Sequence, residues 1–301
     1  MTSLRIADEV RDAIAARRPV VALESTILSH GLPRPDNLAV GRRLESIVRA
    51  GGAVPATVAV IDGALVVGAS DDEIVRLASE PDVVKVSRRD LPIVIARRAL
   101  GATTVSATMI GAARAGIAVF ATGGIGGVHR GFETSLDVSA DLAELGRENV
   151  CVVCAGAKSI LDLPRTMEVL ETLGVPVLGW QTRELPAFFA RESGLSLDHR
   201  VEGAAEVATI LRAKWSLGLA GGVLVAVPPP IVSALPSLEI DALVTAAVEE
   251  AHQRGIRGKE LTPYLLTRLR EATEGRSLVA NVALVSENTR IATQIACALS
   301  G

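Results

Sequence analysis

The expected fold follows from one stretch of the chain, residues 121–166, which reads ATGGIGGVHRGFETSLDVSADLAELGRENVCVVCAGAKSILDLPRT. Two apolar runs frame its first part, IAVFAT at 117–122 and VCVVCA at 150–155. Continuous apolar runs of this length are typical of strands that are buried on both faces of a parallel sheet. Each run opens into polar residues at its carboxyl end, where open α/β sheets bind their ligands. We therefore expect His129, Asp137, Asp141 and Lys158 to gather at one edge of a parallel sheet.

The rest of the chain continues this alternation of strands and helices. Strands are predicted at 20–24, 83–87, 175–180 and 221–227, and a hairpin around Asp62-Gly63 at 54–69. Helices are predicted at 4–17, after a cap at Asn37, from Asp71, and at 91–100, 109–116, from Pro164, 203–216, 238–254, 261–273 and 278–299, the last interrupted around Asn281 or Asn288. This order predicts one domain over residues 1–301, an α/β/α sandwich with a mostly parallel central sheet.

The composition makes several classes of protein improbable. Aromatic residues are only 2% of the chain, so it lacks the stacking surfaces of single-strand nucleic-acid binders, and the net charge of −3 comes with no long basic run. The longest apolar stretch, at 217–227, is too short to span a bilayer and ends in three prolines. The first residues are charged and have no signal-peptide core, and three cysteines suit a reducing compartment. We expect a cytoplasmic protein that binds neither nucleic acid nor membrane.

The glycines of TGGIGGVHRG do not form a recognised nucleotide motif. His129 stands where a dinucleotide-binding fingerprint needs its third glycine, and no Gly-Lys-Ser/Thr sequence follows to make a P-loop. The glycines indicate either a mobile loop or a loop that approaches a ligand closely. Cys151 and Cys154 have the spacing of a redox pair, but they lie inside an apolar strand, which favours buried and inert thiols.

Asp137 and Asp141 are predicted to begin a helix, where carboxylates complement the helix dipole. They also have i and i+4 spacing, so they would share a helix face and offer oxygen ligands to Mg²⁺ or Mn²⁺. The local sequence does not choose between these two roles.

Three other charged residues are placed where solvation is poor. Lys158 follows a strand among small residues; it is either a surface lysine or an amine that attacks a carbonyl carbon to form a Schiff base. Lys85 lies on a predicted buried strand and would suit an anion, and Glu24, at the end of VVALE, would need a partner or an acid–base role. The small residues at 101–108 supply hydroxyl and N–H groups suited to a phosphate.

Seven longer stretches of the sequence resemble the pseudouridine-5′-phosphate glycosidase family, also called indigoidine-synthase-A-like. The stretches are ALESTILSHGLPRPDN, VKVSRRDLP, TTVSATM, TGGIGGVHRG, TSLDVSADL, CAGAKSILDLPRT and SLVANVALV. They occur in order from about Glu24 to beyond Asn281, so the resemblance covers nearly the whole chain. The sugar-kinase domain that some relatives carry is absent, so coupled phosphorylation of pseudouridine is not expected.

The resemblance implies a lyase of glycosidase character that acts in pseudouridine catabolism. It would cleave pseudouridine 5′-phosphate reversibly to uracil and ribose 5-phosphate through a lysine imine adduct, with one Mn²⁺ per subunit of a homotrimer. Carried over by motif, Glu24 is the proton donor, Lys158 the nucleophile and Asp137 the metal ligand. The substrate positions implied in the same way are Lys85, Val105, His129, Ser139, Ala140, Asp141 and Asn281.

Two other functions stay open on the residues alone. Lys158 fits a Schiff-base aldolase or another lyase acting on a sugar phosphate equally well. The same residues would also serve a noncatalytic sensor of a nucleotide or sugar phosphate. Neither the metal preference nor the residue that reads the uracil edge follows from the sequence.

Overall fold

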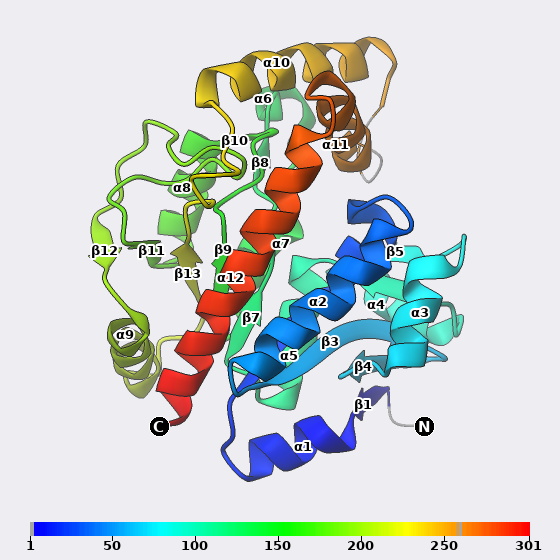
Figure 1. Cartoon of the computed structure of the whole chain (residues 1–301), viewed down its shortest axis with the longest axis vertical. Helices are drawn as coiled ribbons and strands as arrows, with labels where there is room; N and C mark the ends of the chain where they lie inside the picture. The colour runs from blue at the N-terminus through cyan, green and yellow to red at the C-terminus, as the bar shows by residue number, and fades with distance from the viewer. Residues whose placement is uncertain (1–2, 257, 259–260) are drawn as a thin grey trace.

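A sheet of eleven strands runs through the molecule and carries the site (Figure 1). Its strands follow the order β1-β4-β3-β2-β7-β9-β13-β11-β12, while β6 pairs with β3 and β5 pairs with β6. The computed structural model describes residues 3–256, 258 and 261–301. The strands are β1 (Leu4–Ile6), β2 (Val20–Leu23), β3 (Val54–Ile61), β4 (Ala64–Val67), β5 (Val84–Val86), β6 (Gly101–Thr103), β7 (Val119–Ala121), β9 (Cys151–Cys154), β11 (Val177–Trp180), β12 (His199–Val201) and β13 (Val223–Ala226), with β8 (Val128–His129) and β10 (Leu161–Asp162) in a separate pair.

Helices cover both faces of this sheet. They are α1 (Asp8–Ala15), the π-helical turn η1 (Ile27–Gly31), α2 (Asp36–Ala50), α3 (Asp71–Ser79), the 3₁₀ turn η2 (Arg88–Asp90), α4 (Leu91–Ala96), α5 (Val105–Ala115), α6 (Phe132–Ser135), α7 (Ala140–Leu145), α8 (Leu163–Thr172), α9 (Ala204–Ser216), α10 (Ser237–Gln253), α11 (Leu261–Ala272) and α12 (Arg276–Ser300). On one face α12 crosses β2, β7 and β9 beside α2 and α9, and α5 lies on the other face against β3 and β4 (Figure 1).

The predicted α/β/α architecture is therefore confirmed. The central strands β2, β7, β9, β13 and β11 pair in parallel, and β3 is antiparallel to β4 and β6. The hairpin predicted at Asp62-Gly63 also forms, with φ of 50° and 89° at these two residues, because the turn needs a left-handed backbone at both positions.

The first predicted helix is only partly right. Residues Leu4–Ile6 form an edge strand parallel to β4, and α1 begins at Asp8. The apolar spacing at 4–17 fits a helix, but the unpaired edge of β4 offers these residues backbone hydrogen bonds that the local pattern does not reveal. The segment at 25–37, expected as a loop, includes the turn η1.

Two predictions about asparagines are wrong, for a common reason. Asn37 does not cap α2; it is buried in the first turn, and its amide donates to the carbonyls of Leu28 and Ala78. The helix at the end of the chain is continuous through Asn281 and Asn288. The buried Asn288 amide donates to the carbonyls of Thr122 (2.8 Å) and Gly123 (3.2 Å), so it fastens α12 to the end of β7. Polar side chains in these helices are satisfied by other elements.

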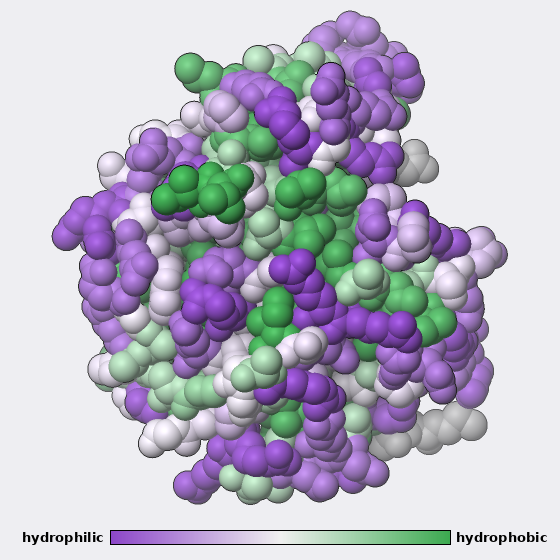
Figure 2. Space-filling view, in the orientation of Figure 1, coloured by the Kyte–Doolittle hydropathy of each residue, from purple (hydrophilic) through white to green (hydrophobic). Residues whose placement is uncertain are grey.

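The surface toward α2 and α12 is mostly hydrophilic, with apolar residues in separate groups (Figure 2). The most exposed large apolar side chains are Val232, Leu238, Ile231 and Leu217. None of the helices in the described part of the chain has the length and hydrophobicity that a bilayer-spanning segment needs.

Strand β7 lies inside the sheet, between β2 and β9. Phe120 is fully buried there between β2 and β9. We expect Phe120→Ala to lower the free energy of unfolding by about 3–5 kcal/mol, because it leaves a cavity that the close-packed sheet cannot collapse. Urea denaturation measures this change. The control is Leu217→Ala, at a side chain that is 75% exposed, where we expect a change within about 0.5 kcal/mol. Equal effects of the two variants would contradict this description of the core.

Candidate active site

A cavity of about 610 Å³ lies at the carboxyl ends of the central strands. It is bordered by the residues that directly follow β2, β5 and β6 and by the loops after β7 and β9, which is the edge that the strand pattern predicts. Every residue singled out as a site candidate lines this one cavity: Glu24, Lys85, Val105, His129, Asp137, Ser139, Ala140, Asp141, Lys158 and Asn281.

Glu24 is held in place by two hydroxyl groups. It is the first residue after β2, is half-buried, and accepts hydrogen bonds from the hydroxyls of Thr26 and Thr122. Thr122 follows the neighbouring strand β7. A half-buried carboxylate with donors on both oxygens is partnered and oriented, as an acid–base group must be.

Lys158 sits on a turn that is fixed to the glycine-rich loop. Gly156 has φ of 81°, and a side chain there would lie 2.5 Å from the carbonyl oxygen of Pro186, so the turn requires glycine. The loops after β7 and β9 continue side by side, because Ile125 N–H donates to Gly156 O and Lys158 N–H donates to Ile125 O, both at 3.1 Å. The half-buried Lys158 side chain lines the cavity.

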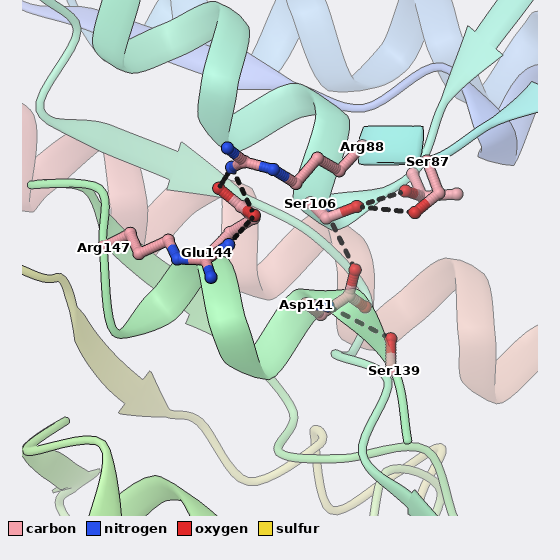
Figure 3. Close-up of polar contacts among 8 residues, drawn as sticks. Ser87, Arg88, Ser106, Ser139, Asp141, Glu144 and Arg147 are labelled. Carbon is pink, nitrogen blue, oxygen red and sulfur yellow. Dashed lines mark hydrogen bonds and ion pairs between the residues drawn. The ribbon is translucent and has the colours of Figure 1, made fainter. Parts of the chain in front are cut away.

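Asp141 fixes the other side of the glycine-rich loop and also binds the start of α5, the contact with Ser106 that Figure 3 shows. It is buried, and its two oxygens accept the backbone N–H groups of Ser106 and Gly126, each at 2.8 Å. A Cβ at Gly126 would lie 2.9 Å from this carboxylate and 2.3 Å from Ser139 Oγ, so only glycine allows the contact. The loop approaches protein atoms closely, and this explains Gly126.

The proposed pairing of Asp137 with Asp141 on one helix face is wrong. Helix α7 begins at Ala140 with Ser139 as its cap, so Asp137 precedes the helix. No cluster of three or more His, Cys, Asp or Glu side chains suited to a metal occurs among the residues that the structure describes. A cation at Asp137 would therefore depend largely on water for its ligands, as Mg²⁺-like ions commonly do.

The segment at 101–108 also differs in detail from the prediction. The Thr103 and Thr108 hydroxyls are fully buried and 2.9 Å apart, and the Ser106 N–H is taken by Asp141. Only Thr104 and Val105 of this segment line the cavity. The small residues therefore serve mainly the packing of α5.

The imidazole of His129 is influenced by the charges of three other residues of the cavity. The backbone N–H of His129 donates to the backbone carbonyl of Asp137 at 3.0 Å. Burial lowers the pKa of its imidazole; the Asp137 carboxylate opposes this shift, while the Lys85 and Lys158 charges add to it. The thiols expected to be inert are fully buried, and burial raises the pKa of Cys151 and raises that of Cys154 to about 12.

The sequence reasoning missed other residues of the cavity wall. Arg88 and Arg89 lie in the turn after the strand that carries Lys85, and a basic pair close to a strand end was the available signal. His30 lies in η1, and its Nε2 has no hydrogen-bond partner among the described residues. Phe188, Thr262, Pro263 and Leu266 also line the cavity. No local pattern predicts them, because their position depends on how remote segments pack over the sheet edge.

A family model described as indigoidine synthase A like protein matches residues 9–298. The chain belongs to this family. A pseudouridine-5′-phosphate glycosidase of Solibacter usitatus is 56% identical over 293 residues, covering 97% of this chain and 98% of the relative. The protein of the same name from Caldanaerobacter subterraneus subsp. tengcongensis is 55% identical over 295 residues, covering 98% and 96%.

Two solved structures share the fold of this family member. The prealnumycin C-glycosynthase AlnA, in complex with ribulose 5-phosphate, is 40% identical with a TM-score of 0.91, covering 99% of this chain and 97% of AlnA. An indigoidine synthase A-like protein from Thermotoga maritima is 38% identical with a TM-score of 0.91, covering 100% and 97%. The chain is an enzyme, as its relatives are.

The imidazoles of His30 and His129 provide a test of this cavity. Burial lowers the pKa of both below the ordinary value of 6.5, and Lys85 contributes at both. We expect histidine NMR titration of the folded protein to place both pKa values below 6.5. The unfolded chain then binds more protons, so their contribution to stability is complete above about pH 6.5 and is lost as the pH falls through the folded pKa. Folded pKa values above 6.5 would contradict the site as described.

Proposed function

We propose that this enzyme reversibly cleaves the C-glycosidic bond of pseudouridine 5′-phosphate to uracil and ribose 5-phosphate. The observation that carries the proposal is the meeting of Glu24, Lys158 and Asp137 in one cavity with three cationic side chains, Lys85, Arg88 and Arg89. Relatives named for this activity match nearly the whole chain at more than half identity, which supports the choice of substrate.

The bond to be cleaved joins two carbons, which excludes simple protonation of an oxygen leaving group as used by ordinary glycosidases. In the proposed first step the Lys158 amine bonds to C1′ while the bond from C1′ to the ring oxygen breaks. Glu24 supplies the proton that the released oxygen needs. The result is an open-chain amine adduct that still carries the uracil.

The second step breaks the carbon–carbon bond. A proton adds to C5 of uracil, and the lysine nitrogen lone pair replaces the departing bond, so uracil leaves and an imine links Lys158 to C1′. Water then hydrolyses the imine, which frees the amine and ribose 5-phosphate. All atoms balance with one water consumed.

A divalent cation fits this site through Asp137 alone. Its half-buried carboxylate faces the cavity, and oxygen ligands suit Mn²⁺. When bound, such a cation would supply Lewis-acid polarisation of substrate oxygens. Lys85, Thr104 and Val105, which line the same cavity, would hold the phosphate. A homotrimer and a cytoplasmic location stay predictions.

The reaction itself is tested by chromatography of pseudouridine 5′-phosphate incubated with the protein. We expect uracil to be released with Mn²⁺ and to be lost with a chelator. Asp137→Asn should raise the Mn²⁺ concentration needed for half-maximal turnover, because it removes the anionic ligand. Undiminished release in chelator would argue against the metal, and no release from folded, Mn²⁺-loaded protein would argue against the substrate.

The covalent step is tested at Lys158. We expect Lys158→Ala to lower turnover by roughly 10³-fold or more, and Lys158→Arg to be equally inactive, since guanidinium stays protonated. Borohydride with ribose 5-phosphate should attach the sugar to wild-type Lys158, as seen by peptide mass spectrometry. Circular dichroism and ribose 5-phosphate binding serve as controls for the fold. Near-normal turnover of Lys158→Ala would exclude the adduct.

The same experiments separate the alternative functions. Trapping of ribose 5-phosphate without uracil release would favour a sugar-phosphate lyase or aldolase. Binding without trapping would favour a noncatalytic sensor.

A further inference from the structure

Glu144 carries a charge in a place where a carboxylate is costly. It lies on α7 with a side chain that is 0% exposed. Both of its oxygens accept hydrogen bonds from Arg88 Nη1, at 2.8 and 2.7 Å, and Arg147 approaches at 3.4 Å (Figure 3). A buried ion pair adds little stability compared with an apolar pair of similar volume. Its position therefore asks for an explanation other than stability.

The partner of Glu144 lines the cavity. Arg88 belongs to η2, and half of its side chain is exposed. Glu144 engages only Nη1, and the N–H groups on Nε and Nη2 make no hydrogen bond within the part of the chain that the structure describes. A guanidinium with free, coplanar donors matches the oxygens of a phosphate.

Hydrogen bonds also hold the residues next to Arg88 in place. The Ser87 hydroxyl lies 3.2 Å from that of Ser106, which lies 3.0 Å from that of Thr104 (Figure 3). One turn before Glu144 on α7, Asp141 holds the Ser106 and Gly126 backbones. Two carboxylates of one short helix thus hold η2, the start of α5 and the glycine-rich loop together.

Arg89 gives the contrast. It also lines the cavity, but it is exposed and makes no ion pair with any residue that the structure describes. A free arginine loses side-chain entropy when it binds an anion, whereas Arg88 has already lost much of it in the folded protein.

We propose that Glu144 is a positioning residue, which holds Arg88 in the orientation in which its free N–H groups bind the 5′-phosphate of the substrate. The identity of the anion rests on the proposed function; the geometry of Glu144 and Arg88 does not.

The test compares Glu144→Gln with Glu148→Gln. Glu148 is one turn further along the chain, and its carboxylate makes no hydrogen bond to a described residue. For Glu144→Gln we expect KM for pseudouridine 5′-phosphate, and Kd for ribose 5-phosphate and for inorganic phosphate by calorimetry, to rise roughly 10- to 100-fold, the range for a charge-assisted hydrogen bond. We expect kcat to change little, and Glu148→Gln to behave as wild type. Unchanged phosphate and ribose 5-phosphate binding in a folded Glu144→Gln protein would overturn the proposal.

A second variant guards against misfolding, because Glu144→Gln leaves Arg88 without its anion. The double variant Arg88→Leu with Glu144→Leu removes both charges, and we expect it to fold but to bind phosphate as weakly as Arg88→Leu alone. A double variant with wild-type affinity would show that the pair is only structural. If wild-type protein releases no uracil while Glu144→Gln still weakens phosphate binding, the proposed function fails and the role of Glu144 stands.

Discussion

The contact on which the rest of the site depends is the Asp141 carboxylate between two backbone N–H groups. Ser106 lies in the first turn of α5 and Gly126 belongs to the loop after β7, so one buried side chain joins this helix to this loop. A buried carboxylate without such donors is strongly disfavoured. The contact with Asp141 causes the close packing at Gly126. It also fixes the loop next to the turn that carries Lys158. The family resemblance implies that Asp141 also contacts the substrate. The same carboxylate would then bind the substrate and the two backbone N–H groups.

The cavity lining combines two kinds of side chain. Lys85, Arg88 and Arg89 come from β5 and η2, while Phe188 and Asn281 come from a loop and from α12. Cationic side chains suit a phosphate, and an aromatic ring with an amide suits a flat base with hydrogen-bonding edges. Glu24 directly follows β2 and Lys158 lies on the turn after β9, so both are positioned by segments that leave the central parallel strands.

The sequence predicted most strands, the layered architecture and the residues that line the cavity. The strands were predictable because continuous apolar runs have few alternatives in a parallel sheet. The roles of Glu24, Lys158 and Asp137 came from family resemblance, since spacing alone left several functions open. The errors arose where a remote partner decides the outcome. The sequence predicts an interruption at Asn281 or Asn288, but the helix is continuous and the Asn288 amide bonds to the end of β7. Leu4–Ile6 forms a strand because it pairs with β4. Such partners are not encoded in a local window.

The anchoring of α12 to β7 by Asn288 has a consequence for biosynthesis. The Thr122 carbonyl accepts from Asn288 while the Thr122 hydroxyl donates to Glu24, so one residue links Glu24 to a helix more than 150 positions later. During translation β2, β7 and β9 are complete long before residue 276 leaves the ribosome. Their apolar face then stays uncovered, and such faces are prone to aggregation and are protected by chaperones. Asn281 lines the cavity and lies on this helix, so the cavity is complete only once α12 has docked.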